Sequence, residues 1–292
     1  MIKKILITGG SGFIGKNLIE AWNGKYDIKY PKREEFNLLD IESVCSYLKK
    51  QKFDIIIHAA NTNGFREKNI TDADVLDRNL KMFFNLEQCS GFYGKMYYFG
   101  SGAEYDMRHY IPNMKEEYFG IHIPVDSYGF SKYIMSKICD NSNNIYDLRL
   151  FGVYGKYEEW HRRFISNAIC RAISGLPITI EKNVYFDYLW ISDLIQIMEW
   201  FVENEPQYKH YNICRGSRID LYSLAIKVKE VSKIDCEILV KFTGLKPEYT
   251  GCNKRMLNEI GEFEFTNWED SIRVLCEFYK KNIDSIMVEK LL

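Results

Sequence analysis

The sequence predicts an α/β protein in which a doubly wound parallel sheet is combined with a smaller, interleaved α/β domain. Near its start the chain has a short apolar run, Ile5 to Ile7, that is typical of a buried parallel strand. Glycines at positions 9, 12 and 15 and a helical stretch follow it directly. Strand and helix patterns then alternate through the first half, whereas the second half is a less regular mixture of both.

The individual elements are expected from their hydrophobic period and length. Short apolar runs predict the strands, and apolar residues at helical spacing predict the helices between them. The expected strands of the first half span residues 5–7, 26–30, 53–58, 95–99 and 145–150, and the expected helices span 16–22, 41–50 and 74–89. In the second half we expect helices at 163–174 and 221–232, a strand at 177–180, and a strand followed by a helix within 187–202.

Composition excludes several classes of protein. The 292 residues carry 39 basic and 40 acidic side chains, and this balance argues against nucleic acid or an anionic membrane as the main partner. No apolar run approaches the roughly 20 residues that cross a bilayer, and the first run is too short for a signal peptide. The eight cysteines show no C-x-x-C pair, so we expect reduced, buried thiols in a cytoplasmic protein. The five histidines have no metal-ligand spacing, so no metal site is expected.

The glycine-rich turn is the first candidate site. Gly9, Gly12 and Gly15 form the pattern G-x-x-G-x-x-G between a strand and a helix. Glycine permits a tight turn and lets the backbone approach a pyrophosphate, while the helix N-terminus beyond it offers free N–H groups. A plain strand-to-helix turn would also explain the pattern. Its place in the first strand–turn–helix unit favours dinucleotide binding.

The residues after the second and third strands bear on which dinucleotide is bound. An enzyme that uses NAD usually has an Asp or Glu after the second strand, to bind the ribose hydroxyls. Here the first charges are Lys32 and Arg33, which would attract the extra phosphate of NADP. Glu34 and Glu35 follow at once, so NAD stays possible. After the third strand, the small residues Ala59-Ala60-Asn61 let the backbone lie against a ligand.

Three residues have the chemistry of carbonyl reduction. Ser101 follows a strand, and Tyr128 and Lys132 share one face of a predicted helix. A nearby ammonium lowers the pKa of a tyrosine, which can then pass a proton to a carbonyl oxygen that the serine holds by a hydrogen bond. The spacing also occurs at Tyr133 and Lys137, which we interpret as a packing tyrosine and a solvated lysine.

Together these residues resemble an extended short-chain dehydrogenase/reductase of the NAD-dependent epimerase/dehydratase family, which acts on nucleotide sugars. The resemblance covers nearly the whole chain in the expected order. The matching segments are Thr8 to Gly15, Asn37 to Asp40, His58 to Ala60, Phe99 to Ser101, Tyr128 to Lys132, Leu148 to Phe151, Phe186 to Asp193 and Lys246 to Glu248. It implies a Rossmann domain that binds NAD(P), formed by residues 1–155 with about 184–214, and a substrate domain formed mostly by residues 156–292.

Within this family, the segment from Arg33 to Asp40 is most similar to GDP-L-fucose synthase-type nucleotide-sugar reductases. Those enzymes epimerise with a cysteine two residues after the catalytic serine and with a later histidine. Ala103 and Arg163 stand at these positions, which favours a reductase without epimerisation. Gly152 and Phe186 replace an Asn and an Arg that relatives often use for the substrate, so the sugar and the nucleotide stay open.

The resemblance also assigns contacts residue by residue. Those expected at the cofactor are Gly9, Gly12, Phe13, Ile14, Gly15, Lys32, Arg33, Asn37, Leu38, Asp40, Ala59, Ala60, Asn61, Asn79, Phe99, Tyr128, Lys132 and Phe151. Those expected at the substrate are Ser101, Gly102, Tyr128, Arg163, Lys246 and Arg255. Ordinary solvated surface charges would explain Arg163, Lys246 and Arg255 equally well. Asn79 would also fit an ordinary exposed position on a helix.

The expected reaction is reduction of a nucleotide-linked 4-keto-6-deoxysugar by NADPH, with hydride going to C4 and Tyr128 protonating the new hydroxyl. The main alternative is a nucleotide-sugar C4-epimerase, or epimerase/reductase, that keeps NAD(P) bound. A non-catalytic cofactor-binding protein and a reductase of another carbonyl are further alternatives. A dehydratase is disfavoured because Gly102 and Ala103, instead of Asp-Glu, follow Ser101. The resemblance implies a homodimer formed by the helix at 74–89 and the helix that carries Tyr128.

Overall fold

The computed structural model describes residues 2–62 and 70–291, which fold into two compact units. Unit 1 consists of Met1–His109, Lys115–Leu150 and Trp200–Ile213, and unit 2 of Tyr110–Met114, Phe151–Glu199 and Cys214–Leu292. The chain thus leaves unit 1 at residue 150, five residues before the boundary that we expected. Of the expected return segment 184–214, only 200–213 lies in unit 1, because the strand at 185–190 pairs within unit 2.

Unit 1 contains the predicted parallel sheet. Its order is β2-β1-β3-β4-β5-β9, and each neighbouring pair is parallel. The strands are β1 (Lys4–Thr8), β2 (Asp27–Lys29), β3 (Phe53–His58), β4 (Tyr93–Ser101), β5 (Ile145–Leu150) and β9 (His210–Ile213). Strand order reverses between β1 and β3, and this switch point is where open α/β sheets bind their ligands. The predicted doubly wound sheet is confirmed.

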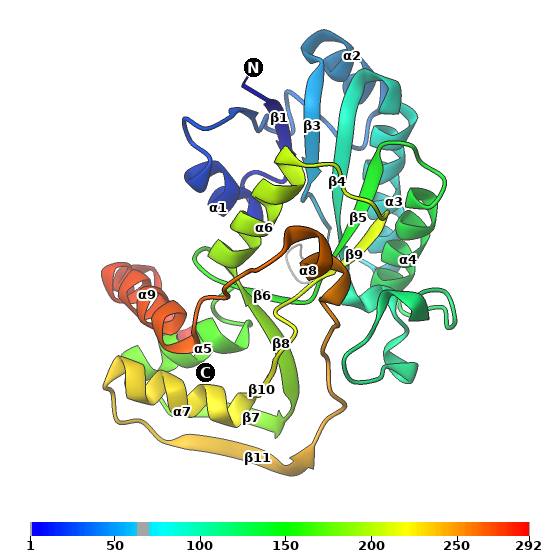
Figure 1. The fold of residues 1–292 in the computed structure, drawn as a ribbon. Helices are drawn as coiled ribbons and strands as arrows, with labels where there is room; N and C mark the ends of the chain where they lie inside the picture. The colour runs from blue at the N-terminus through cyan, green and yellow to red at the C-terminus, as the bar shows by residue number, and fades with distance from the viewer. Residues whose placement is uncertain (1, 63–69, 292) are drawn as a thin grey trace. The chain divides into compact units, whose positions relative to one another are not determined.

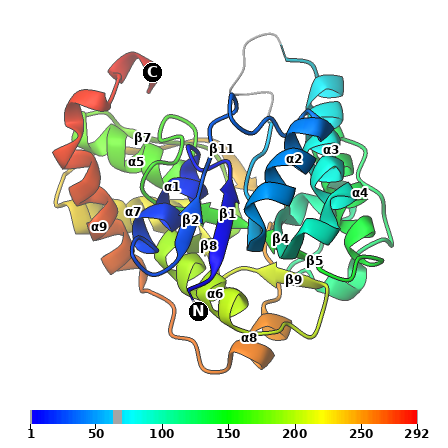
Figure 2. The same ribbon diagram turned by 90° about the horizontal axis from the view of Figure 1, so that it is seen from above.

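Three helices of unit 1 cover one face of this sheet, as Figures 1 and 2 show. They are α2 (Ile41–Gln51), α3 (Asp72–Gln88) and α4 (Ser127–Cys139), while α1 (Phe13–Ala21) follows the glycine turn. Aspartates accept backbone N–H groups at the start of α2 and α4, and Thr71 and Asp74 form a capping box at the start of α3. Short 3-10 turns lie at η1 (Ser90–Phe92), η2 (Gly102–Glu104), η3 (Met107–His109) and η4 (Glu116–Tyr118).

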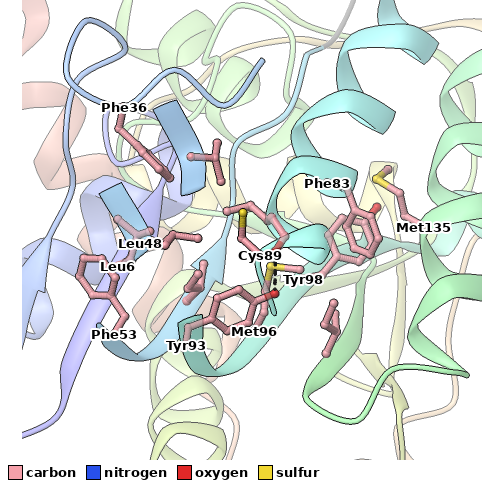
Figure 3. Packing of buried hydrophobic residues seen from close by; sticks show 14 of the residues in the cluster. Leu6, Phe36, Leu48, Phe53, Phe83, Cys89, Tyr93, Met96, Tyr98 and Met135 are labelled. Atoms are coloured by element: carbon pink, nitrogen blue, oxygen red, sulfur yellow. Dashed lines mark hydrogen bonds between the residues drawn. The ribbon is translucent and has the colours of Figure 1, made fainter. Parts of the chain in front are cut away.

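The core of unit 1 lies between the sheet and these helices (Figure 3). Side chains alternate between the two faces of a strand, so Tyr98 of β4 joins this cluster with Phe83 and Met135. The neighbouring Tyr97 faces the other way and donates a hydrogen bond from its hydroxyl to the carbonyl of Phe201. Both faces of β4 are therefore buried, which holds its C-terminal end in a fixed position.

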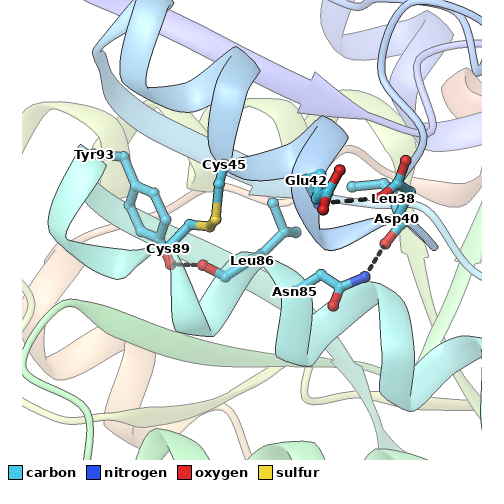
Figure 4. The surroundings of a disulfide bond; sticks show 8 residues. All are labelled: Leu38, Asp40, Glu42, Cys45, Asn85, Leu86, Cys89 and Tyr93. Atoms are coloured by element: carbon cyan, nitrogen blue, oxygen red, sulfur yellow. Dashed lines mark hydrogen bonds between the residues drawn. A yellow bond between two sulfur atoms is a disulfide. The ribbon is translucent and has the colours of Figure 1, made fainter.

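One covalent link in this layer differs from our expectation for the cysteines. Cys45 of α2 and Cys89, which ends α3, form a disulfide across the two helices (Figure 4). No local pattern predicts this pair, because the two residues are 44 positions apart and meet only when α2 packs on α3. The other six cysteines are free thiols, five of them buried, as expected.

Unit 2 is a mixture of short strands and helices. A three-stranded sheet has the order β10-β8-β6, and β11 pairs with β7 in parallel. The strands are β6 (Gly152–Tyr154), β7 (Ile178–Asn183), β8 (Tyr185–Trp190), β10 (Arg218–Asp220) and β11 (Ile238–Leu245). The helices are α5 (Phe164–Ile173), α6 (Ile191–Glu203, whose last turn belongs to unit 1), α7 (Leu221–Ser232), α8 (Lys254–Ile260) and α9 (Trp268–Lys281), followed by η5 (Ile283–Ser285) and η6 (Val288–Lys290). Helices α5, α7 and α9 pack on one another. Within residues 2–62 and 70–291, no helix has the length and apolar character of a membrane span.

Candidate active site

The glycine turn between β1 and α1 forms a cradle that side chains would fill. Gly9 has φ +70°, and a Cβ there would lie 2.7 Å from the backbone nitrogen of Ala60. A Cβ on Gly15 would lie 2.4 Å from the carbonyl oxygen of Gly9. Gly12 caps α1 in an extended conformation and donates its N–H to that same carbonyl over 2.9 Å. The turn therefore brings bare backbone and the N-terminus of α1 to the switch point, which is the geometry that receives a pyrophosphate.

A buried polar contact fixes the other side of this cradle. The Thr8 hydroxyl accepts the N–H of Ala60 over 3.2 Å and is hydrogen-bonded to Nδ1 of His58 over 2.8 Å. Burial, and then the positive charge of Lys132, lowers the pKa of His58 to about 3, so its ring is neutral and can accept this bond. Next to Ala60, Oδ1 of Asn61 is buried and has no hydrogen-bond partner within the described part of the chain. An unsatisfied acceptor beside the cradle fits a ligand that carries hydroxyl groups.

The segment after β2 leaves its basic residues in solvent. Lys32 and Arg33 are exposed, and the side chain of Tyr30 packs over Gly10, where a Cβ would lie 2.7 Å from the tyrosine Cβ. Asp40 accepts the N–H of Glu42 as the N-cap of α2. These positions fit the expected ribose phosphate site through charge and exposure.

Further along, side-chain amides hold the loops that flank the cradle. Asn37 accepts the N–H of Leu39, and Asn85 of α3 donates to the carbonyl of Leu38 over 2.8 Å (Figure 4). Asn79 is buried and exchanges two hydrogen bonds with the backbone of Thr62, at 2.8 and 2.9 Å. Asn79 is thus not an exposed helix residue: it clamps the loop after β3, which carries Asn61.

The structure brings Ser101, Tyr128 and Lys132 to the C-terminal end of β4. Ser101 is the last residue of β4, and the other two lie in the first turns of α4. Lys132 Nζ donates to the carbonyl of Phe99 over 2.9 Å and lies 5.7 Å from the ring centroid of Tyr128. Gly129 lets α4 approach the turn after Ser101 closely, since a Cβ there would lie 2.7 Å from the carbonyl oxygen of Ala103.

Lys132 is almost fully buried, which sets its charge. Burial lowers the pKa of its ammonium to about 8, and the carboxylates Glu104 and Asp147 oppose this shift. Its Nζ also lies 4.6 Å from the ring centroid of Tyr98. At neutral pH Lys132 is therefore a cation beside the Tyr128 ring, as the proposed chemistry requires.

The sequence did not predict the polar network behind Ser101. Its hydroxyl accepts the N–H of Ala103 over 3.1 Å, and its own N–H donates to Oε1 of Glu104 over 2.9 Å. This is a capping box, and Ser101-x-x-Glu104 is its sequence signature. Oε2 of Glu104 accepts from Nε of Arg149 in β5 over 2.6 Å. Both side chains are fully buried, so a buried ion pair lies next to the serine backbone.

The other expected substrate residues are divided between the units. Gly102 is buried in η2 of unit 1, beside Ser101. Arg163, Lys246 and Arg255 all lie in unit 2: Arg163 is exposed as the N-cap of α5, Lys246 pairs with Glu181, and Arg255 lies on α8. Phe151, expected at the cofactor, also lies in unit 2, where its ring is 5.3 Å from that of Tyr249.

Comparison with known proteins identifies related sequences. Residues 5–214 match the model of the NAD dependent epimerase/dehydratase family. GDP-L-colitose synthase from Yersinia pseudotuberculosis is 24% identical over 311 residues, covering 96% of this chain and 100% of the relative. GDP-6-deoxy-D-talose 4-dehydrogenase from Aggregatibacter actinomycetemcomitans is 26% identical over 312 residues, covering 96% of this chain and 97% of the relative.

Solved structures share the fold at lower identity. A GDP-L-fucose synthetase from Naegleria fowleri superposes with a TM-score of 0.85 at 15% identity, covering 97% of this chain and 94% of that one. A GDP-mannoheptose C4 reductase from Campylobacter jejuni, solved with NADP bound, superposes with a TM-score of 0.81 at 21% identity, covering 96% and 98%. These likenesses extend over both units.

Proposed function

The chain belongs to the NAD dependent epimerase/dehydratase family of extended short-chain dehydrogenases/reductases, and on this premise we propose that it reduces a nucleotide-linked 4-keto-6-deoxysugar with NADPH. The observation that carries the proposal is the grouping of Ser101, Tyr128 and Lys132 at the end of β4. Ala103 stands where the fucose synthase group has its epimerising cysteine, and alanine cannot exchange a proton. Reduction without epimerisation therefore fits these residues best.

The cofactor fits the residues around the switch point. Gly9, Gly12 and Gly15, with the start of α1 at Phe13 and Ile14, would hold the pyrophosphate. Lys32 and Arg33 would bind the ribose phosphate, and Asn37, Leu38 and Asp40 would flank the adenine. Ala59, Ala60, Asn61, Asn79, Phe99 and Phe151 complete the proposed set. NADP or NADPH is bound in several related structures, and NAD stays possible because Glu34 and Glu35 follow the basic pair.

The proposed roles in the reaction follow from geometry and charge. When bound, NADPH supplies a hydride to the carbonyl carbon. The Ser101 hydroxyl, which already accepts from Ala103, donates its hydrogen to the carbonyl oxygen. Tyr128 donates a proton to that oxygen, and the Lys132 ammonium stabilises the phenolate that remains. Gly102, Arg163, Lys246 and Arg255 are proposed substrate contacts, the three cations for the diphosphate.

The nature of the relatives also bears on the substrate and the assembly. Relatives are named for GDP-linked deoxysugars and heptoses, which supports a sugar nucleotide. We include in the proposal a cytoplasmic location and a homodimer formed through α3 and α4, which pack side by side (Figures 1 and 2). A nucleotide-sugar C4-epimerase, or epimerase/reductase, that retains NAD(P) is the second candidate, because one solved structure of this fold is titled UDP-glucose 4-epimerase, from Thermotoga maritima. The dinucleotide that co-purifies with the protein separates the two.

The proposal is tested by following NADPH oxidation at 340 nm with a panel of GDP-, dTDP- and CDP-linked 4-keto-6-deoxysugars. We expect oxidation with at least one sugar, and a loss of about 10²- to 10⁴-fold in the variant Tyr128→Phe, since a phenylalanine cannot donate the proton. If no sugar gives oxidation above the rate of Tyr128→Phe, the reductase proposal is wrong.

A further inference from the structure

The fully buried carboxyl group of Glu104 has no part in the reaction proposed above, yet it touches the catalytic serine's backbone. Its Oε1 accepts the N–H of Ser101 over 2.9 Å, and its Oε2 accepts from Nε of Arg149 over 2.6 Å. Burying a charged group costs free energy unless it is paired. The complete burial of Glu104, at 0% exposure, therefore calls for partners that offset this cost. The two bonds connect the end of β4 to the neighbouring strand β5.

A second carboxyl group approaches the same point. A Cβ placed on Gly100 would lie 2.1 Å from Oδ1 of Asp147 and 2.2 Å from Oε1 of Glu104, so both oxygens face this glycine. The Oδ1 atom of Asp147 is buried, and no described donor reaches it when both acids are charged. A proton on Glu104 would satisfy it. Burial and the charge of Asp147 raise the pKa of Glu104 well above its usual range, in keeping with one shared proton.

Further hydrogen bonds of Asp147 and Arg149 connect this network to the elements around it. Asp147 accepts from Ser136 of α4 over 2.7 Å, and Nε of Arg149 lies 3.0 Å from its Oδ2. Burial would raise the pKa of Asp147, but Arg149, His210 and Ser136 together lower it, so this acid holds the negative charge. Arg149 also donates to the hydroxyl of Tyr105 over 3.1 Å and to that of Ser136 over 2.9 Å. The network thus joins β5, α4 and the turn after β4.

We propose that Glu104 is a positioning residue for carbonyl reduction, whose carboxyl group, bound to Arg149 and Asp147, fixes the Ser101 backbone so that its hydroxyl faces the substrate. The inference rests on the reductase function proposed above. Ser101 ends a strand and begins a turn, where its φ of −152° and ψ of 148° are shared with many loop conformations. The bond to Glu104 selects one of them. A shift of about 1 Å in a catalytic group can cost about 100-fold in rate.

The test is the variant Glu104→Gln. A glutamine amide has one oxygen and one NH₂ group, so it cannot accept from both Ser101 and Arg149. We expect kcat to fall about 10- to 100-fold while KM for NADPH changes less than about twofold. In a Ser101→Ala background the same change should cost less than about twofold, because the hydroxyl it positions is already absent. A full additional loss in that background would overturn the proposal.

The matched control is Glu116→Gln. Glu116 is also a buried carboxyl group of unit 1 that accepts a backbone N–H, from Asn212 over 2.9 Å, and the glutamine oxygen can keep this bond. We expect this variant to retain kcat. An equal loss of kcat in both variants would show a general structural effect and would overturn the proposal.

A second readout does not depend on activity. Amide hydrogen exchange of a peptide covering residues 99–105 should show the Ser101 N–H exchanging about tenfold faster or more in Glu104→Gln, and unchanged in Glu116→Gln. Unchanged Ser101 exchange in Glu104→Gln would overturn the proposal. A wild-type protein that reduces none of the sugars would overturn the reductase function and the catalytic half of this inference, whereas the exchange would still decide whether Glu104 holds Ser101.

Discussion

Two of the buried glutamates, one in each unit, have very different partners. Glu104 in unit 1 is 0% exposed and lies between Arg149, Asp147 and the Ser101 backbone. Glu158 in unit 2 is 5% exposed and accepts a hydrogen bond from the Ser166 hydroxyl, while its Oε2 has no hydrogen-bond partner within the described residues. Burial raises the pKa of both acids, to about 7 for Glu158.

The two glutamates differ in which buried polar groups would lose their hydrogen-bond partners if the carboxyl charge were removed. Removing a member of the Glu104 network strands other buried polar groups, because each makes bonds to the rest. Removing the charge of Glu158 weakens only its bonds with the Ser166 hydroxyl and the Gly155 backbone, while Arg163 acts on this acid through its charge. We infer that the network beside Ser101 holds the backbone of this serine in position. The burial of Glu158, by contrast, only lowers the free energy of unfolding.

The comparison is most severely tested by Arg149→Met. This change removes the guanidinium that Glu104 and Asp147 share, so the negative charge that they hold loses its fully buried counter-ion. Breaking a buried ion pair from one side typically costs about 3–5 kcal/mol. We expect that loss in the free energy of unfolding, measured in urea, and a larger loss at pH 8 than at pH 5. Arg149→Lys, which keeps the charge, should lose less, and equal losses would contradict the role of the charge.

The fold of unit 1 could be predicted because its signals are local. The run Ile5 to Ile7 lies within one strand, and Gly9 lies in the turn that follows it. Neighbouring residues decide the conformation of both segments. The Glu104 network depends on contacts across β4 and β5, between residues 45 positions apart. A sequence pattern assigns a glutamate to the surface by default, so its burial beneath Ser101 was missed although Ser101-x-x-Glu104 was visible.

The candidate site divides in the same way. Tyr128 and Lys132 were found because one helical turn sets their spacing. The two hydrogen bonds between Asn79 and the Thr62 backbone, and the disulfide between Cys45 and Cys89, were not predicted. Each of them forms only when two separate elements pack together. The roles proposed for Arg163, Lys246 and Arg255 rest on charge alone, and they remain predictions.

On the other side of the comparison, Glu158→Gln should stabilise the protein at alkaline pH. The folded pKa of Glu158 is raised to about 7 from an ordinary value of 4.5, so its contribution to stability is complete below pH 4.5 and is lost as pH rises through 7. The variant lacks this loss. We expect a gain of about 2–3 kcal/mol in the free energy of unfolding at pH 8 and no gain at pH 4.5, from paired urea titrations. A gain that does not vary with pH would contradict this account.

The smallest expected effect concerns Gly100, where the two acids of unit 1 converge. In Gly100→Ala the new methyl group would lie 2.1 Å from Asp147 and 2.2 Å from Glu104, so these side chains must move away from Arg149 and Ser101. Overpacking of this kind costs about 1–3 kcal/mol. Gly91→Ala is the control, because a Cβ at Gly91 has no neighbour within 4 Å. We expect thermal unfolding at a lower temperature and a reduced kcat for Gly100→Ala alone. If Gly100→Ala unfolds like Gly91→Ala and keeps its kcat, the network beside Ser101 is no more constrained than the rest of unit 1, and the contrast with Glu158 fails.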